Sequence, residues 1–101
     1  MPKGYWIVRV NVRELERYKK YTEVNVVAIG KYGGRFLVRG GKAEAVMGEG
    51  CERSVVIEFP DYETARACFD SPEYQHALEV RGDAAEANII IVEGFEGPQP
   101  G

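Results

Sequence analysis

Histidine, cysteine and metal-binding patterns are scarce in this sequence, and their scarcity limits the chemistry available to the chain. His76 is the one histidine, and no carboxylate at a suitable spacing joins it to complete a metal site. Cys51 and Cys68 are the two cysteines, and their spacing matches no zinc or redox motif. The glycine pairs are not followed by the residues of a phosphate-binding or dinucleotide-binding loop. We therefore expect no bound metal, haem or flavin and no other cofactor.

Excess positive charge is also missing. The 13 basic and 16 acidic residues leave a formal net charge of −3, whereas a general nucleic-acid binder needs a basic surface that releases counterions. No apolar run approaches the length of a membrane span. The opening residues Met1 to Gly4 lead directly into a predicted strand, without the apolar segment of a signal peptide. We expect a cytoplasmic protein with neither nucleic-acid nor membrane partners.

The two cysteines are not expected to form a disulfide, because the sequence has no secretory features. Cys68 lies among Ala65, Ala67 and Phe69 in a predicted helix. A free thiol among apolar side chains is usually buried, so we predict that Cys68 is a buried free thiol.

The apolar residues follow the periodicities of a mixed α+β domain. The 101 residues, 45% of them hydrophobic, suffice for one domain at residues 1–94, followed by a flexible tail at 95–101 that is rich in glycine and proline. Runs of β-branched and aromatic residues predict strands, and apolar spacings of three and four predict helices. The predicted strands are Tyr5–Val12, Arg35–Val38 with a continuation at Ala43–Met47, Ser54–Phe59 and Glu86–Glu93; the predicted helices are Arg13–Ile29, Tyr62–Phe69 and Ser71–Arg81.

The order of these elements, βαββαβ, is that of the ferredoxin-like split βαβ fold. Right-handed crossovers then give an antiparallel sheet of order 4-1-3-2 with the helices on one face. Gly33-Gly34 marks the end of the first helix, and Gly40-Gly41 predicts a bulge or sharp bend in the second strand.

The opposite face of this sheet is not the polar face that a solvated sheet would present. Its alternate positions mix apolar residues with charges: Ile7, Leu37, Val56, Ile90 and Val92 beside Arg9 and Glu58. A second copy of the same sheet is the simplest cover for such a face. We therefore expect a homodimer.

Five segments carry a resemblance to a known family: Gly4–Ile7, Tyr32–Gly41, Val55–Pro60, Ser71–Gln75 and Ile91–Gly94. With them the chain resembles the uncharacterised bacterial family named domain of unknown function thirteen-thirty, of the dimeric α+β barrel superfamily. The resemblance covers nearly the whole chain and implies that two sheets, one from each subunit, form a barrel with the helices outside. It implies no reaction, because superfamily relatives include cofactor-independent monooxygenases, lactone isomerases, haem enzymes and ligand-sensing modules, and fold does not determine function.

Two charged residues inside apolar strands are the main candidates for a ligand site. Arg39 can hold a carboxylate by two parallel hydrogen bonds, and Glu58 can act as a general base if burial raises its pKa. The alternative is a structural ion pair, within or between subunits. Strand alternation does not decide between them, because the break at Gly40-Gly41 leaves the face of Arg39 open.

Further candidates lie on the predicted helices. Tyr18 and Tyr21 share a helix face, and with Tyr74 they would either line a cavity between helices and sheet or pack in the core with satisfied hydroxyls. His76 is a candidate for proton transfer near neutral pH, or a solvent-facing helical residue. Ser71 either contributes to the pocket or caps the helix that begins at Pro72.

Two functions therefore remain at this point. The first is a dimeric small-molecule-binding protein or cofactor-independent enzyme that acts on a small organic acid or ring compound, with a ligand site drawn from Tyr18, Tyr21, Arg39, Glu58, Ser71, Tyr74 and His76. The alternative is a non-catalytic module that senses a metabolite or supports an assembly. The sequence leaves open whether the protein is an enzyme.

Overall fold

The centre of the sheet is the apolar segment near the start of the chain. In the computed structural model, which describes residues 1–101, β1 (Gly4–Val12) pairs antiparallel with β3 (Arg53–Phe59) on one side and β4 (Ala85–Glu93) on the other. The short β2 (Arg35–Arg39) pairs antiparallel with the outer side of β3. The strand order β2-β3-β1-β4 confirms the predicted ferredoxin-like sheet of order 4-1-3-2.

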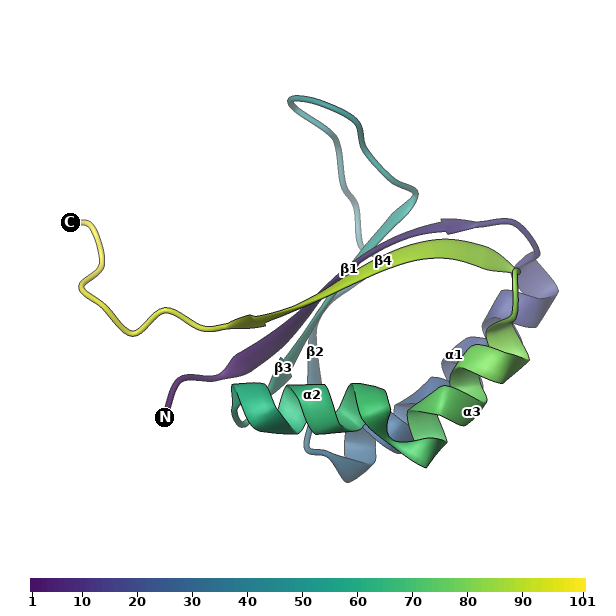
Figure 1. The fold of residues 1–101 in the computed structure, drawn as a ribbon. Coiled ribbons are helices and arrows are strands. Elements are labelled where there is room, and N and C mark those ends of the chain that lie inside the picture. Colours follow the sequence, from purple (N-terminus) through teal and green to yellow (C-terminus); the bar gives the residue numbers. More distant parts are fainter.

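The helices α1 (Leu15–Lys31), α2 (Tyr62–Asp70) and α3 (Pro72–Arg81) all lie on one face of the sheet, as predicted (Figure 1). α2 begins where the Asp61 carboxylate accepts a hydrogen bond from the backbone N–H of Thr64. Ser71 caps α3 in the same way, and Pro72 takes the first helical position. None of the three helices is long and apolar enough to cross a membrane.

The first helix is displaced by two residues at both ends from its predicted range. Its start is delayed because the backbone N–H groups of Arg13 and Glu14 both donate to the carbonyl of Ala84, which ties these residues into a turn. Its end comes at Gly33, whose φ of +73° lets the N–H of Gly34 reach back to the carbonyl of Ile29. The glycine stop signal is therefore confirmed, although the helix continues to Lys31.

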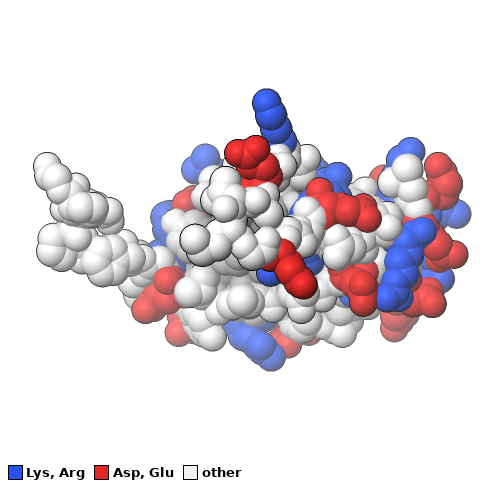
Figure 2. All heavy atoms as spheres, turned by 90° about the horizontal axis from the view of Figure 1, so that it is seen from above, with Lys and Arg blue, Asp and Glu red and all other residues white.

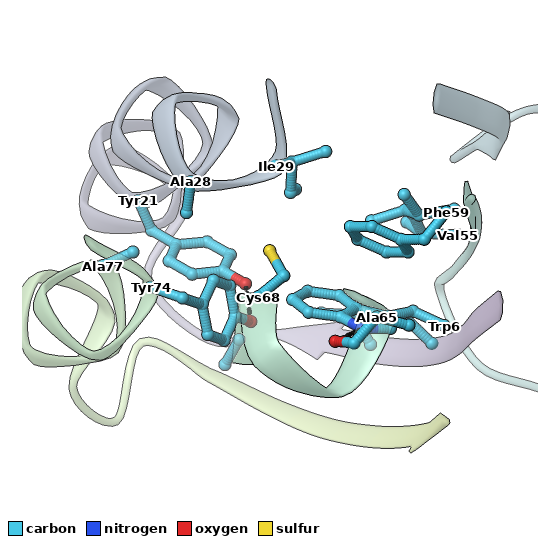
Figure 3. Packing of buried hydrophobic residues seen from close by; sticks show 14 of the residues in the cluster. Trp6, Tyr21, Ala28, Ile29, Val55, Phe59, Ala65, Cys68, Tyr74 and Ala77 are labelled. Carbon is cyan, nitrogen blue, oxygen red and sulfur yellow. Dashed lines mark hydrogen bonds between the residues drawn. The ribbon is translucent and has the colours of Figure 1, made fainter. Parts of the chain in front are cut away.

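The hydrophobic core lies between the helices and the inner face of the sheet, meaning the face that the helices cover. Trp6, only 1% exposed, stands at its centre and donates an indole N–H to the carbonyl of Ala65 at 2.9 Å. Its ring packs edge-on against Tyr74 and tilted against Phe59, with centroids 4.9 and 5.2 Å away. Figure 3 shows this cluster bridging β1, β3 and the helices.

The connection between β2 and β3 corrects the sequence analysis. β2 ends at Arg39, and residues 40–52 form no strand, so the predicted continuation at Ala43–Met47 is wrong. Gly40, with φ +70°, turns the chain away, and the segment projects from the uncovered side of the sheet (Figure 1). The irregularity in β2 lies between Phe36 and Val38 rather than at Gly40-Gly41.

The outer face of the sheet, opposite the helices, is uncovered within one chain. Ile7, Leu37, Ile90 and Val92 are exposed there, and Ile90 is 62% exposed. Seen from this side, basic and acidic side chains are interspersed, and neither sign gathers over a large area (Figure 2). The mixed apolar and charged character predicted for this face is confirmed.

Candidate functional site

A bulge in β2 decides which face of the sheet Arg39 occupies. Phe36 stands opposite Ile57 and Arg39 opposite Val55, so three steps along β2 match two along β3. The extra residue reverses the alternation of side chains. Arg39 therefore joins Phe36 on the inner face, and its guanidinium carbon lies 4.1 Å from the centre of the Phe36 ring.

Arg39 lines a pocket between α1, α3 and the inner face of the sheet. The sheet supplies an apolar wall that includes Trp6, Val55 and Ile57. The polar side chains come from the helices and the strand ends: Tyr18, Tyr21, Thr22 and Asn25 from α1, Tyr74 and Arg81 from α3, Arg39 and Arg53 from β2 and β3. About 30 Å³ is open to the centres of water molecules, which is room for roughly two or three waters.

Three arginines surround this pocket, and none has an acidic partner. The guanidinium carbons of Arg39, Arg53 and Arg81 lie over the rings of Phe36, Tyr18 and Tyr21, at 4.1, 5.8 and 5.3 Å from the ring centres. The lining contains no Asp or Glu. Arg53 and Arg81 also bury Nε–H groups without a hydrogen-bond partner.

The other arginines of the chain are engaged elsewhere. Arg13, Arg17, Arg35 and Arg66 all form ion pairs with carboxylates, and Arg9 donates to the carbonyl of Glu49. Three of the four arginines that form no ion pair thus lie at the pocket, where low polarity strengthens their attraction for an anion.

The tyrosine hydroxyls of the pocket are affected by burial and by their neighbours. The hydroxyl oxygens of Tyr21 and Tyr74 lie 2.6 Å apart and are buried, and burial raises the pKa of Tyr74. Burial also raises the pKa of Tyr18, against the opposing effect of the Arg53 charge. At neutral pH the phenols of Tyr18 and Tyr74 are therefore hydrogen-bonding groups rather than bases.

Glu58 lies outside the pocket, on the outer face. Its Oε2 accepts from the Tyr5 hydroxyl at 3.2 Å, and its Oε1 lies 3.7 Å from Nη1 of Arg35. Arg39 and Glu58 therefore form no ion pair within one subunit, because the bulge places them on opposite faces. An ion pair between subunits stays a prediction. Glu58 is equally misplaced as a base for a pocket ligand.

Ser71 and His76 also lie outside the lining of the pocket. The Ser71 hydroxyl donates to the carbonyl of Cys68 and accepts from the N–H of Tyr74, so it serves as the cap of α3. His76 is exposed on the same helix. Of the seven predicted site residues, the structure brings together four: Tyr18, Tyr21, Arg39 and Tyr74.

Sequence reasoning missed Arg53, Arg81 and Asn25. Each carried a usable signal: Arg53 stands two residues before the inward-facing Val55, and Arg81 is seven residues after Tyr74 on the same helix face. Asn25 falls one turn after Tyr21 on the buried face of α1. No three His, Cys, Asp or Glu side chains converge to form a metal site.

Several solved structures share this fold. A protein of unknown function from Rhodopseudomonas palustris matches with a TM-score of 0.76 at 17% identity, over 95% of this chain and 85% of that chain. SnoaB, a cofactor-independent oxygenase from Streptomyces nogalater, matches with a TM-score of 0.63 at 12% identity, over 99% and 97%. A dimeric ferredoxin-like protein of unknown function from Thermobifida fusca matches with a TM-score of 0.55 at 12% identity, over 91% of each chain.

At these identities the structural likeness shows the fold alone. No curated protein matches the sequence significantly. The family model described as Domain of unknown function (DUF1330) matches residues 3–95, which include every segment that carried the resemblance. The chain therefore belongs to the DUF1330 family.

Proposed function

We propose that this protein binds a small carboxylic acid with an apolar body in the pocket between α1, α3 and the sheet. The observation that carries the proposal is the set of three arginines, Arg39, Arg53 and Arg81, around a lining that contains no carboxylate. Partly buried charges without counter-charges are costly. A ligand carboxylate would supply the missing counter-charge through the paired hydrogen bonds that a guanidinium forms.

The remainder of the lining suits the apolar body of such a ligand. Twelve of the seventeen lining residues are hydrophobic, and small-molecule sites typically combine apolar walls with a few polar groups. The space is narrow, so the ligand is small or displaces a side chain at the opening. Arg39, which is exposed although it contacts the pocket, is the side chain best placed to move.

The lining of the pocket favours ligand binding over acid–base catalysis by side chains of the protein. The lining contains no His, Asp, Glu, Lys or Cys, which are the residues that most often transfer protons in enzymes. The enzymatic alternative is a cofactor-independent reaction in the same pocket, for which the likeness to SnoaB is the support. Turnover of a bound acid, followed by NMR of the ligand, would separate the two.

Calorimetric titration with acetate, butyrate and benzoate tests the proposal. At least one of these acids is expected to bind saturably, and Arg39→Met and Arg53→Met should each weaken it about tenfold or more, because a charge-assisted hydrogen bond is lost. Arg66→Met, which removes an arginine of α2 outside the pocket, is the matched control. Absence of binding by all three acids, or binding by the Arg39 and Arg53 variants that is as tight as in the wild type, would overturn the proposal.

We also propose that the outer face of the sheet is covered by a second copy of the chain. Exposed Ile7, Ile90 and Val92 support this, since contiguous exposed apolar side chains mark interaction surfaces. The Thermobifida fusca protein of the same fold is described as dimeric. Light scattering should give about twice the chain mass of 11.3 kDa, and a stable monomer at micromolar concentration would contradict the proposal.

A further inference from the structure

Asn25 is a buried polar side chain for which the protein supplies no partner. It lies on the inward face of α1, one turn after Tyr21, and is only 9% exposed. The residue lines the pocket, and its Oδ1 is buried and accepts no hydrogen bond. Buried hydrogen-bond acceptors nearly always have a donor, so the unpaired Oδ1 of Asn25 requires an explanation.

The neighbouring hydroxyls do not satisfy Asn25. The Thr22 hydroxyl donates to the carbonyl of Lys19 at 2.8 Å. The hydroxyls of Tyr21 and Tyr74 form one hydrogen bond with each other. One of the two hydroxyls donates its proton in that bond, and the proton of the other hydroxyl is left free to donate elsewhere. The pocket therefore offers an unused acceptor at Asn25 and one unused phenolic donor.

We infer that the ligand is a hydroxy acid, whose hydroxyl donates to Oδ1 of Asn25 while its carboxylate is held by the arginines. This inference rests on the proposed function. A carboxylate has no proton to donate at neutral pH, so the donor is a second group on the ligand. A hydroxyl both donates and accepts, and can satisfy Asn25 and the free phenolic proton together.

An amino acid fits the same site less well. Its ammonium would be a fourth positive charge in a pocket with three guanidinium groups and no carboxylate in its lining. Like charges in a low-polarity site repel strongly. The electrostatics therefore select a hydroxyl over an ammonium as the donor to Asn25.

Two sets of matched acids test the inference. One is butyrate with 2-hydroxybutyrate and 3-hydroxybutyrate; the other is benzoate with its three hydroxy isomers, and the methylbenzoates control for added size. In the wild-type protein at least one hydroxylated acid should bind about tenfold more tightly than its parent acid, because an unpaired buried acceptor gains its partner. The corresponding methyl compound should show no such gain.

The Asn25→Leu variant then locates the hydroxyl. It should bind the hydroxylated acid no more tightly than the parent acid, whereas Arg66→Met, outside the pocket, should keep the preference. If the parent acids bind and no hydroxylated acid binds more tightly, water alone occupies the Asn25 position and the inference fails while the proposed function stands. If no acid binds at all, both fail. A hydroxyl preference that survives in Asn25→Leu would also overturn the inference.

Discussion

The two sides of the sheet differ in how their arginine side chains are paired. On the outer side Arg35 pairs with Glu58 and Arg13 with Glu86, and Arg9 donates to the backbone carbonyl of Glu49. Around the pocket on the inner side Arg39, Arg53 and Arg81 lie over aromatic rings and form no ion pair. Internally neutralised charge suits a face that meets another protein surface, whereas unmatched charge beside an apolar wall suits a site for a small anion.

The two faces also differ in how far their apolar side chains are exposed. Inner-face residues such as Trp6 are fully buried by the helices, whereas Ile90 on the outer face is largely exposed. The stability of the subunit should therefore depend on the inner face, and its association on the outer face.

The largest expected effect is that of Trp6→Ala, which should lower the free energy of unfolding by about 3–5 kcal/mol. It removes the ring that packs against Phe59 and Tyr74, and leaves the carbonyl of Ala65 without its donor. Ile90→Ala on the outer face should change the stability of the subunit by no more than about 0.5 kcal/mol.

Chemical denaturation at two protein concentrations separates these effects. The loss in Trp6→Ala should be the same at both concentrations, whereas any loss in Ile90→Ala should grow with dilution, because it acts on the dimer. Equal losses of unfolding free energy in the two variants, unchanged by protein concentration, would contradict the distinction between the faces.

A second comparison uses one tyrosine from the core and one from the outer face. Tyr74→Phe should cost about 1–3 kcal/mol, because it leaves the buried hydroxyl of Tyr21 without its partner at 2.6 Å. Tyr5→Phe on the outer face, where the hydroxyl bonds to Glu58 at 3.2 Å, should cost about 1 kcal/mol or less. Thermal melts of both variants measure the difference, and a larger loss for Tyr5→Phe would contradict it.

A further effect is expected in alkaline solution. Burial raises the pKa of the Cys68 thiol from 9.0 to about 12. A group whose pKa is raised on folding contributes its full stability below the pKa of the unfolded state, and loses it as the pH rises through the folded value. Stability should thus fall between about pH 9 and 12, as measured by denaturation over that range, and the slope should be shallower in Cys68→Ala.

Cys51 is the matched control for that prediction. A hydrogen bond with Ser54 lowers the pKa of its thiol, with help from Arg9, and the residue is only partly buried. Cys51→Ala should leave the alkaline slope unchanged. In a thiol-reactivity assay at pH 8 Cys51 should react promptly and Cys68 only on unfolding, and fast reaction of both thiols in the native protein would refute the assignment.

Most of the fold could be predicted, because local patterns determine it. The alternation in Tyr5–Val12, the glycine stop after α1 and the caps Asp61 and Ser71 all mark element boundaries that the structure confirms. Both cysteines are free and Cys68 is buried, as its apolar neighbours indicated.

The candidate site was less predictable, because it depends on one bulge and on two long side chains. No glycine or proline marks the irregularity at Leu37, so the sequence suggested a break at Gly40-Gly41 instead. Only the pairing of β2 with β3 shows that Arg39 faces inward. Local periodicity places Arg53 and Arg81 on the inward sides of their elements, but both lie at element ends, and only the tertiary structure shows that they line a common pocket.

Trp6 provides the most direct test of whether the arginine-lined pocket binds an anion. It is the only tryptophan and lines the pocket, so its indole N–H gives one unambiguous signal in a proton–nitrogen NMR spectrum. On titration of the wild-type protein with butyrate or benzoate, we expect this signal to shift and saturate. In the double variant Arg39→Met and Arg53→Met it should remain in place at the same concentrations. An indole signal that never moves in the wild type, or that follows the same curve in the double variant, would contradict the account.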